Sequence, residues 1–234
     1  MLTPIGQIVE LRTARSSATV ATLAAALTSL EVDGRELSER TPATRLPGHG
    51  NGIVLAPWPN RVRDARWTHD GQVQHLDVTD PSRGNAIHGL LRNTAYRVLE
   101  RTDAAVTLGA HIHPQHGWPF LLETWVRYAL AEDGLTVTHG ARNLGAARAP
   151  WAVGAHPYFR VGEVPVEQLT LEVRAARYLE LDDRLVPVAV RDVEPGGEFD
   201  LSTPRELAGL DLNVGYQDVA TGPSGVAVLT APDG

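Results

Sequence analysis

Short apolar segments separated by turn residues run through almost the whole chain, and this pattern constrains its fold more than any other feature. The segments are rich in valine, leucine, threonine and aromatic residues. Glycine, proline, aspartate or asparagine lies between them, which is typical of β-strands. From Thr124 to Leu130 apolar and polar residues alternate with the period of a strand that buries one face. No helical pattern of comparable length is present, so the sequence predicts an all-β protein.

The predicted strands are residues 19–26, 28–32, 73–76, 96–101, 105–112, 121–130, 135–142, 152–155, 168–174, 177–181 and 225–230. Glu132-Asp133-Gly134 predicts a hairpin between two of them, and Asp33-Gly34 predicts a turn. So many strands in one chain predict a large antiparallel β-sandwich, with ligand chemistry on a concave face or at loops along one edge. Because no repeat, linker or charge block marks a boundary, we expect a single domain over residues 1–234.

The balance of 28 acidic against 21 basic residues gives a formal net charge of -7. This charge argues against nucleic acid or an anionic membrane as the main partner, and it favours a small neutral ligand. The chain has no cysteine, which excludes disulfides, thiolate metal sites and a cysteine nucleophile. Residues 18–27 form an apolar run after two arginines, as in a short signal peptide, but threonines interrupt this run. No run reaches the roughly 18 apolar residues of a membrane-spanning helix, and we expect a soluble, cytoplasmic protein.

The stretch from Trp151 to Gly162 contains a His-Pro step between two glycines. Its apolar approach predicts a buried strand, and Pro157 removes a backbone donor directly after His156, so we expect the strand ladder to be interrupted there. An interrupted strand can direct a side chain into a cleft. Histidine titrates near neutral pH, which makes His156 a candidate proton donor or acceptor. The alternative is an imidazole that packs between Trp151 and Tyr158 without a chemical role.

Two further motifs place hydrogen-bonding side chains beside residues that shape the backbone. In the segment from Pro57 to Arg61, two prolines stiffen a backbone that presents the amide of Asn60 next to a guanidinium. This pair suits adjacent ligand hydroxyls, or alternatively a salt bridge that fixes a loop. His88 precedes Gly89, which allows a close backbone approach to a ligand or another strand. Two histidines in similar strand-end settings favour a site, although each alone would more often be structural.

Asp211 lies between two leucines, where a carboxylate must find a partner or shift its pKa. It is a candidate acceptor for ligand hydroxyls, or alternatively a turn or capping residue. His111, His113 and His116 have a spacing that could hold a metal. Because this segment runs into Pro114 and no neighbouring carboxylate orients an imidazole, we expect a solvated loop and no metal. Motifs for serine hydrolysis, nucleotide hydrolysis and hydride transfer are absent from the sequence.

Taken in order, five motifs of this chain resemble the aldose 1-epimerase (galactose mutarotase) family. They are Pro57-Trp58-Pro59-Asn60-Arg61, Asn85-Ala86-Ile87-His88-Gly89, Gly117-Trp118-Pro119-Phe120, Gly154-Ala155-His156-Pro157-Tyr158-Phe159 and Leu210-Asp211. The resemblance extends over nearly the whole chain. It implies a large antiparallel β-sandwich, often called a supersandwich, that interconverts the α and β anomers of free aldoses without a cofactor.

The resemblance also implies roles for the candidate residues. His156 would be the general acid, and His88 would position the sugar near its anomeric centre. Arg61 and Asp211 would bind sugar hydroxyls, and Asn60 belongs to the same motif as Arg61. Opening a pyranose ring requires one proton to leave the C1 hydroxyl while another reaches the ring oxygen, so such a site needs both an acid and a base.

The family's base is a glutamate in a Glu-Pro motif near the C-terminus, and no suitable glutamate follows Asp211 here. Glu194-Pro195 precedes Asp211 in a turn-rich stretch, so it is not assigned. We therefore expect that the sequence lacks its C-terminal strands, or that this member has lost its base. Leu212 follows Asp211 where many relatives have another acidic residue, and Asp218 is the alternative to Asp211.

The leading functional hypothesis is an aldose 1-epimerase that acts on a free aldohexose. A non-catalytic carbohydrate-binding or sensing protein on the same fold is the main alternative, because it would explain the missing glutamate. A hexose-6-phosphate 1-epimerase would need additional cations, for which Arg63, Arg66, Arg83 and Arg92 are available. The preferred sugar and the oligomeric state cannot be predicted from the sequence.

Overall fold

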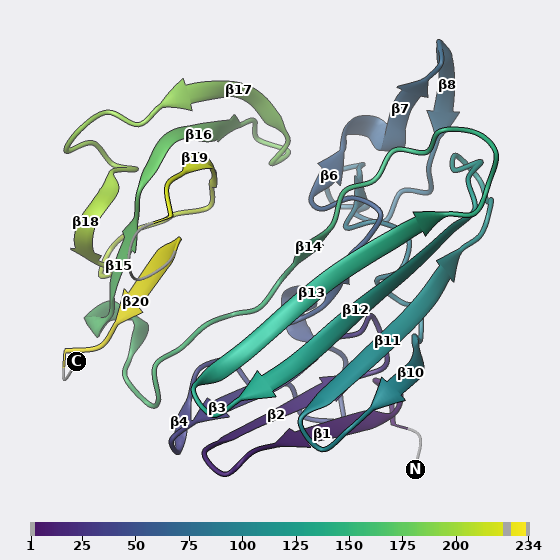
Figure 1. Cartoon of the computed structure of the whole chain (residues 1–234). Coiled ribbons are helices and arrows are strands. Elements are labelled where there is room, and N and C mark those ends of the chain that lie inside the picture. Colours follow the sequence, from purple (N-terminus) through teal and green to yellow (C-terminus); the bar gives the residue numbers. More distant parts are fainter. Residues whose placement is uncertain (1–2, 222–225, 233–234) are drawn as a thin grey trace. The chain divides into compact units, whose positions relative to one another are not determined.

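The computed structural model of the chain describes residues 3–221 and 226–232. The chain forms two compact units, Met1–Phe159 and Arg160–Gly234, which we describe separately. Almost every element is a β-strand, and the strand pairs are antiparallel (Figure 1). The predicted all-β antiparallel fold is confirmed, and the single domain over residues 1–234 stays a prediction.

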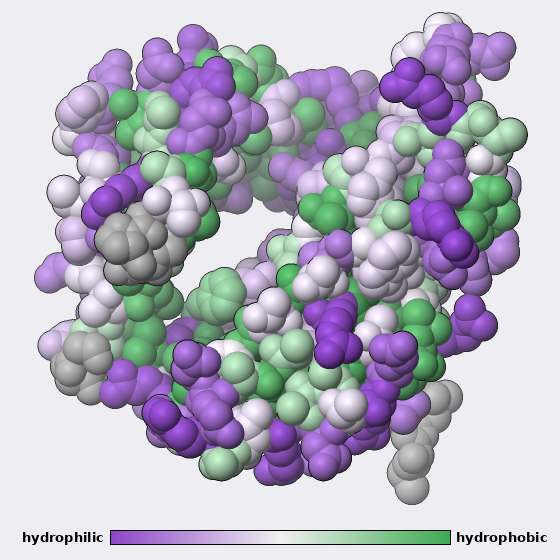
Figure 2. All heavy atoms as spheres, in the orientation of Figure 1, coloured by the Kyte–Doolittle hydropathy of each residue, from purple (hydrophilic) through white to green (hydrophobic). Residues whose placement is uncertain are grey.

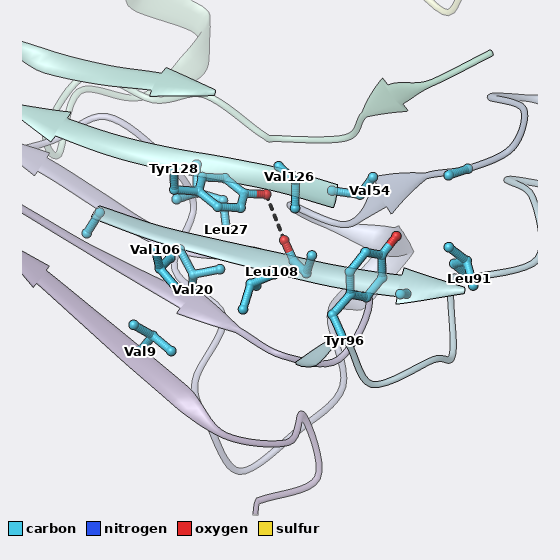
Figure 3. Packing of buried hydrophobic residues seen from close by; sticks show 14 of the residues in the cluster. Val9, Val20, Leu27, Val54, Leu91, Tyr96, Val106, Leu108, Val126 and Tyr128 are labelled. Atoms are coloured by element: carbon cyan, nitrogen blue, oxygen red, sulfur yellow. Dashed lines mark hydrogen bonds between the residues drawn. The ribbon is translucent and has the colours of Figure 1, made fainter. Parts of the chain in front are cut away.

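Two four-stranded sheets form the sandwich of the first unit, with the strand orders β1-β2-β3-β4 and β10-β11-β12-β13. Their strands are β1 (Ile8–Arg12), β2 (Ser16–Ala21), β3 (Leu27–Val32), β4 (Arg35–Glu36), β10 (Arg97–Arg101), β11 (Ala105–Ile112), β12 (Leu122–Ala131) and β13 (Gly134–Asn143). Val9 and Val20 from the first sheet and Leu108 and Val126 from the second belong to one buried cluster (Figure 3). The alternation seen in the sequence of β12 thus places every second residue in this core.

Three short strand pairs complete the first unit. They are β5 (Val54–Leu55) with β14 (Gly154–Ala155), β6 (Arg61–Val62) with β9 (Ala86–Ile87), and β7 (Arg66–His69) with β8 (Gln72–His75). The first two pairs carry or adjoin the candidate site residues Asn60, Arg61, His88 and His156. The hairpin of β7 and β8 ends in a hydrophilic tip (Figure 2).

The second unit contains two three-stranded sheets with the orders β18-β15-β20 and β17-β16-β19. Their strands are β15 (Thr170–Val173), β16 (Ala175–Leu181), β17 (Pro187–Asp192), β18 (Leu201–Glu206), β19 (Gly215–Val219) and β20 (Ala227–Thr230). A small buried cluster of Val161, Leu169 and Ala231 packs against neighbouring leucines and Val164. Three short 3-10 turns, η1 (Gly48–Gly50), η2 (Arg63–Ala65) and η3 (Val166–Gln168), are the helical elements of the described residues. None of the helices found there is long and apolar enough to cross a membrane.

Several predicted boundaries agree with the structure. The strand 105–112 coincides with β11, the β12–β13 hairpin turns at Glu132-Asp133, and β3 turns into β4 at Asp33-Gly34 with both residues at positive φ. The predicted strand 19–26 is wrong beyond Ala21, because Ala24 and Ala25 have positive φ values of 53° and 48°. Short or irregular strands such as β1, β5 and β17 to β19 were not predicted. Gly225, the first residue of the last predicted strand, lies outside the described residues.

Two buried tyrosines in the core of the first unit differ in one respect. The hydroxyl of Tyr128 donates a hydrogen bond of 2.7 Å to the backbone carbonyl of Ala25 (Figure 3). The hydroxyl of Tyr96 is buried without a partner among the described residues. Tyr128 therefore fixes the turn at Ala25 to the opposite sheet, whereas the hydroxyl of Tyr96 loses its hydration for no compensating bond.

We expect Tyr128→Phe to lower the free energy of unfolding by about 1–3 kcal/mol, because the buried carbonyl of Ala25 loses its donor. The matched variant Tyr96→Phe should be neutral or stabilising, because it removes an unpaired buried hydroxyl. Urea unfolding of both variants and the parent chain measures this difference. Equal losses in the two variants would contradict this account of the core.

Candidate active site

The backbone of His156 is bonded to the edge of the sandwich. β14 pairs with β5, and the pairing continues past it: the N–H of His156 donates to the carbonyl of Ile53 (3.1 Å), and the N–H of Gly52 donates to the carbonyl of His156 (2.8 Å). Gly52 also accepts a hydrogen bond from the N–H of Leu27, at 3.0 Å. A Cβ on residue 52 would lie 1.9 Å from the carbonyl oxygen of Leu27, so this contact requires glycine.

The ladder ends after His156, as the sequence predicts. Pro157 has no N–H, and the next donor, Tyr158 N–H, bonds to the side-chain oxygen of Asn51 at 3.1 Å. Asn51 is buried and donates in turn to the carbonyl of Glu39. The prediction of a buried strand is wrong in one respect, because β14 has two residues and Ala155 is exposed. The side chain of His156 consequently lies at a half-buried edge rather than inside the core.

His88 and Asn60 hold each other through two hydrogen bonds. The N–H of His88 donates to the carbonyl of Asn60 (3.0 Å), and the N–H of Asn60 donates to Nδ1 of the His88 ring (3.2 Å). Both residues have positive φ, 64° for His88 and 59° for Asn60. Because Nδ1 accepts a hydrogen bond, the neutral ring carries its proton on Nε2. The sequence predicted both residues, but not that one fixes the tautomer of the other.

Gly89 confirms the expected close backbone approach beside His88. A Cβ on residue 89 would lie 2.0 Å from the carbonyl oxygen of Ala56, and the same carbonyl accepts a hydrogen bond from Leu90 N–H at 2.8 Å. Ala56 directly follows β5, which is the partner of β14. The segments that carry His88 and His156 are therefore attached to the same short strand.

The structure brings the two imidazoles together. The ring centroids of His88 and His156 are 5.3 Å apart at an interplanar angle of 75°, and the ring centroid of Tyr158 is also 5.3 Å from that of His156. The nitrogens of the His156 ring make no hydrogen bond to any residue that the structure describes. Burial, the nearby charge of His156 and the charges of Arg92 and Arg61 lower the pKa of His88 to about 4. His88 is therefore neutral at physiological pH.

Arg61 is anchored by an aspartate that the sequence did not single out. The Nε of Arg61 donates to Asp80 at 2.8 Å, and its side chain is 15% exposed. Burial works to raise the pKa of Asp80, but hydrogen bonds from Arg61 and Ser82 and the charges of Arg61 and Arg83 outweigh it, and the pKa lies below its ordinary value. A second nitrogen of Arg61 lies 3.4 Å from the side-chain oxygen of Asn60.

Two cavities flank these segments. One, of about 220 Å³, is almost entirely apolar and is lined by Trp58, Trp67, Trp118 and Trp151 together with prolines and aliphatic residues. The other, of about 180 Å³, has Trp58 on one side and Arg92, Asn93 and His116 among its polar residues. Neither of these two cavities is lined by His88 or His156. Both histidines are half-buried.

The remaining candidates lie in the second unit. Asp211 is exposed in the connection between β18 and β19, so the expected apolar surroundings are not found, although it lies between leucines in the sequence. Its role in binding stays a prediction. Asp218, the alternative, lies on β19 and accepts a hydrogen bond from Arg177, which together with the charge of Arg177 lowers its pKa. Glu194 lies in the turn-rich segment after β17.

The histidine cluster differs from its predicted environment. His111 belongs to β11, and His113 and His116 follow it in the predicted loop. A carboxylate lies beside two of them: Glu123 is 3.8 Å from His111, and Asp77 is 3.2 Å from His116. The prediction that no neighbouring carboxylate orients an imidazole is therefore wrong. Both carboxylates come from strands or loops that are distant in the sequence, so the local pattern could not indicate them. Within the described ranges, no group of three or more potential ligands could hold a metal ion.

The fold is similar to solved structures of known name. A homologue of GalM/aldose epimerase from Caenorhabditis elegans superposes with a TM-score of 0.83 over 97% of this chain and 75% of that one, at 19% identity. A galactose 1-epimerase from Lactobacillus acidophilus gives a TM-score of 0.78 over 96% and 73%, at 20% identity. These likenesses establish a galactose mutarotase-like fold.

Sequence comparison gives the family. The uncharacterized protein YihR of Escherichia coli is 33% identical over 84% of this chain, and the galactose mutarotase of Rattus norvegicus is 28% identical over 67%. The chain spans 63% and 46% of the lengths of these two relatives. The model of the aldose 1-epimerase family matches residues 7–232, so that nearly the whole chain is covered. The chain belongs to the aldose 1-epimerase family.

Proposed function

We propose that the protein is an aldose 1-epimerase that interconverts the anomers of a free aldohexose. The observation that carries the proposal is the pair of His88 and His156, whose rings are in contact but differ in their hydrogen bonding. One ring is neutral and held in a single tautomer, and the other has both nitrogens available. A mutarotase site needs one group that orients the sugar and another that transfers a proton to the ring oxygen. The fixed, neutral ring suits the first role, and the ring with free nitrogens suits the second.

In the proposed reaction, His156 donates a proton to the ring oxygen while a base removes the proton of the C1 hydroxyl. The bond between C1 and the ring oxygen breaks, and C1 becomes an aldehyde carbon. Rotation about the bond between C1 and C2 presents the other face of the carbonyl, and reclosure by the reverse proton transfers gives the other anomer. No electron is transferred, and no proton is gained or lost overall.

His88 has a different role in this proposal. Its Nδ1 is occupied by the N–H of Asn60, so its Nε2–H is left to donate a hydrogen bond to a sugar oxygen. Its low pKa keeps this group a neutral donor that does not compete with His156 for the transferred proton. His88 therefore positions the sugar near its anomeric centre.

Arg61 and Asn60 would bind hydroxyls next to the histidine pair. The bond from Arg61 Nε to Asp80 fixes the guanidinium plane, Nη1 donates to Asn60 at 3.4 Å, and Nη2 is left for a ligand. Asp211 is proposed as a further acceptor for sugar hydroxyls. The base is unassigned: Asp80 is occupied by Arg61 and Ser82, and the described carboxylates of the first unit make no hydrogen bond to His88 or His156.

We expect His156→Ala to slow mutarotation by about two to four orders of magnitude, because the ring oxygen loses its proton donor. Polarimetry of freshly dissolved galactose or glucose with the protein measures the rate. His75→Ala removes an exposed imidazole on β8 and serves as the control. A chelator should leave the rate unchanged, since the proposed chemistry uses protein groups alone.

Three results would contradict the proposal. Equal rates for His156→Ala and the parent would remove His156 from the mechanism. Activity that is lost with the chelator and restored by one metal would point to metal-dependent chemistry. Sugar binding by calorimetry without any acceleration of mutarotation would favour the alternative, a non-catalytic carbohydrate-binding protein.

The low pKa of His88 predicts a pH dependence of stability. The pKa is about 4 in the folded chain and about 6.5 for an unperturbed histidine. Between these values the unfolded chain binds a proton that the folded chain does not, so His88 lowers stability as the pH falls from about 6.5 to about 4. Well above pH 6.5 both states are neutral and the effect is absent.

His88→Gln removes this contribution. The difference in unfolding free energy between the parent and His88→Gln should therefore shift in favour of the variant as the pH falls from 7.5 to 4. Urea unfolding at several pH values measures it, and titrating groups that do not interact with His88 cancel in the difference. A difference that does not change with pH would show that His88 titrates normally in the folded chain.

A further inference from the structure

The outer face of the second sheet carries a tryptophan between two glycines. Leu122, Thr124 and Val126 of β12 point into the core, so the residues between them point outward. In the strand register, Gly109 of β11 lies opposite Trp125, and Trp125 lies opposite Gly140 of β13. The three residues form one row across the sheet, with the indole in the middle.

The indole lies against the backbone of β13. A Cβ on residue 140 would come within 2.2 Å of Cε2 and of Cζ2 of Trp125, so the fused edge of the ring covers Gly140. On the other side, Leu99 covers Gly109 in the same way, at 2.6 Å. Trp125 is partly exposed, and its indole N–H donates to no residue that the structure describes. The ring thus rests on the strand with one side toward solvent.

Polar rows flank this aromatic row on both sides. In register, one neighbouring row contains His111, Glu123 and Arg142, and Glu123 is 2.9 Å from Arg142 and 3.8 Å from His111. The other row contains Thr107, Arg127 and Thr138. Residues two positions apart on a strand are separated by about 7 Å. Donors and acceptors therefore lie on both sides of the indole. If a six-membered sugar ring stacked on the indole, these groups would lie near the edge of the sugar ring.

We propose that this outer face, centred on Trp125, binds a pyranose ring at a second site. A pyranose has an apolar C–H face, which suits the exposed side of the indole, and a rim of hydroxyls, which suits carboxylate, guanidinium and hydroxyl groups. The face combines cationic and anionic side chains, so it favours a neutral ligand over an anion. The site uses none of the residues proposed for catalysis, and it does not require a free anomeric hydroxyl.

The indole N–H of Trp125 is a local reporter for this site. The full chain labelled with ¹⁵N should give one indole resonance for each of its five tryptophans, and the loss of one in Trp125→Phe identifies Trp125. Methyl β-D-galactopyranoside, which cannot open its ring, serves as the probe. We expect it to shift the Trp125 resonance with a saturable dependence on concentration.

Variants of the flanking row test whether the shift reports a built site. Glu123→Ala and Arg142→Ala should each weaken the affinity measured at the Trp125 resonance several-fold, whereas the matched Arg191→Ala on β17 should leave it unchanged. Trp125→Ala removes the reporter itself, so it is used only to separate this face from turnover: mutarotation of free galactose by this variant should stay at the parental rate. The four other indole resonances confirm that each variant is folded.

The proposal would be overturned by either of two results. One is a Trp125 resonance that does not move, or moves only linearly, while the probe is raised to high concentration. The other is a saturable shift that is the same in Glu123→Ala and Arg142→Ala as in the parent. Because the readout does not depend on turnover, loss of mutarotation in the parent chain would count against the proposed function and not against this site.

Discussion

The candidate site depends on two places where a glycine lets one backbone lie against another. Gly52 contacts the carbonyl of Leu27, and Gly89 contacts the carbonyl of Ala56. The first contact joins the segment that pairs with His156 to β3, and the second joins the segment of His88 to the end of β5. Any side chain at either position would push these segments away from the sandwich. The distance between the two imidazoles is therefore set by backbone contacts to the core, and not by flexible loops.

The strand pattern was sufficient to predict the second sheet of the sandwich, β10 to β13, because its long strands bury one face along many residues. β11 and β12 carry this signal over their whole length, and their predicted bounds are close to those in the structure. β5, β6, β9 and β14 have two residues each, which is too short for any periodicity. Their pairing follows from tertiary contacts, and the sequence could indicate only that glycine and proline made these segments irregular.

Motifs singled out residues that the structure brings together, but they did not predict how these residues are held. Asn60 and His88 are 28 positions apart, and their reciprocal bonding emerges only when β6 and β9 pair. Asp80 was not singled out in the sequence, although it is buried and fixes Arg61. Asp211 shows the opposite error, because apolar neighbours in the sequence did not bury it. Burial of a single charged residue depends on distant segments, which no local pattern records.

The positive φ angles of Asn60 and His88 have a consequence for how this chain can change. A left-handed backbone costs a residue other than glycine about 1–2 kcal/mol, although asparagine and histidine adopt it more readily than most. Glycine at either position would relax the backbone, yet at position 88 it would also delete the imidazole that faces His156. Thermostability and the proposed role in sugar binding thus make opposite demands on position 88. Selection or design for a more stable chain would have to leave this strained histidine in place and gain its stability elsewhere.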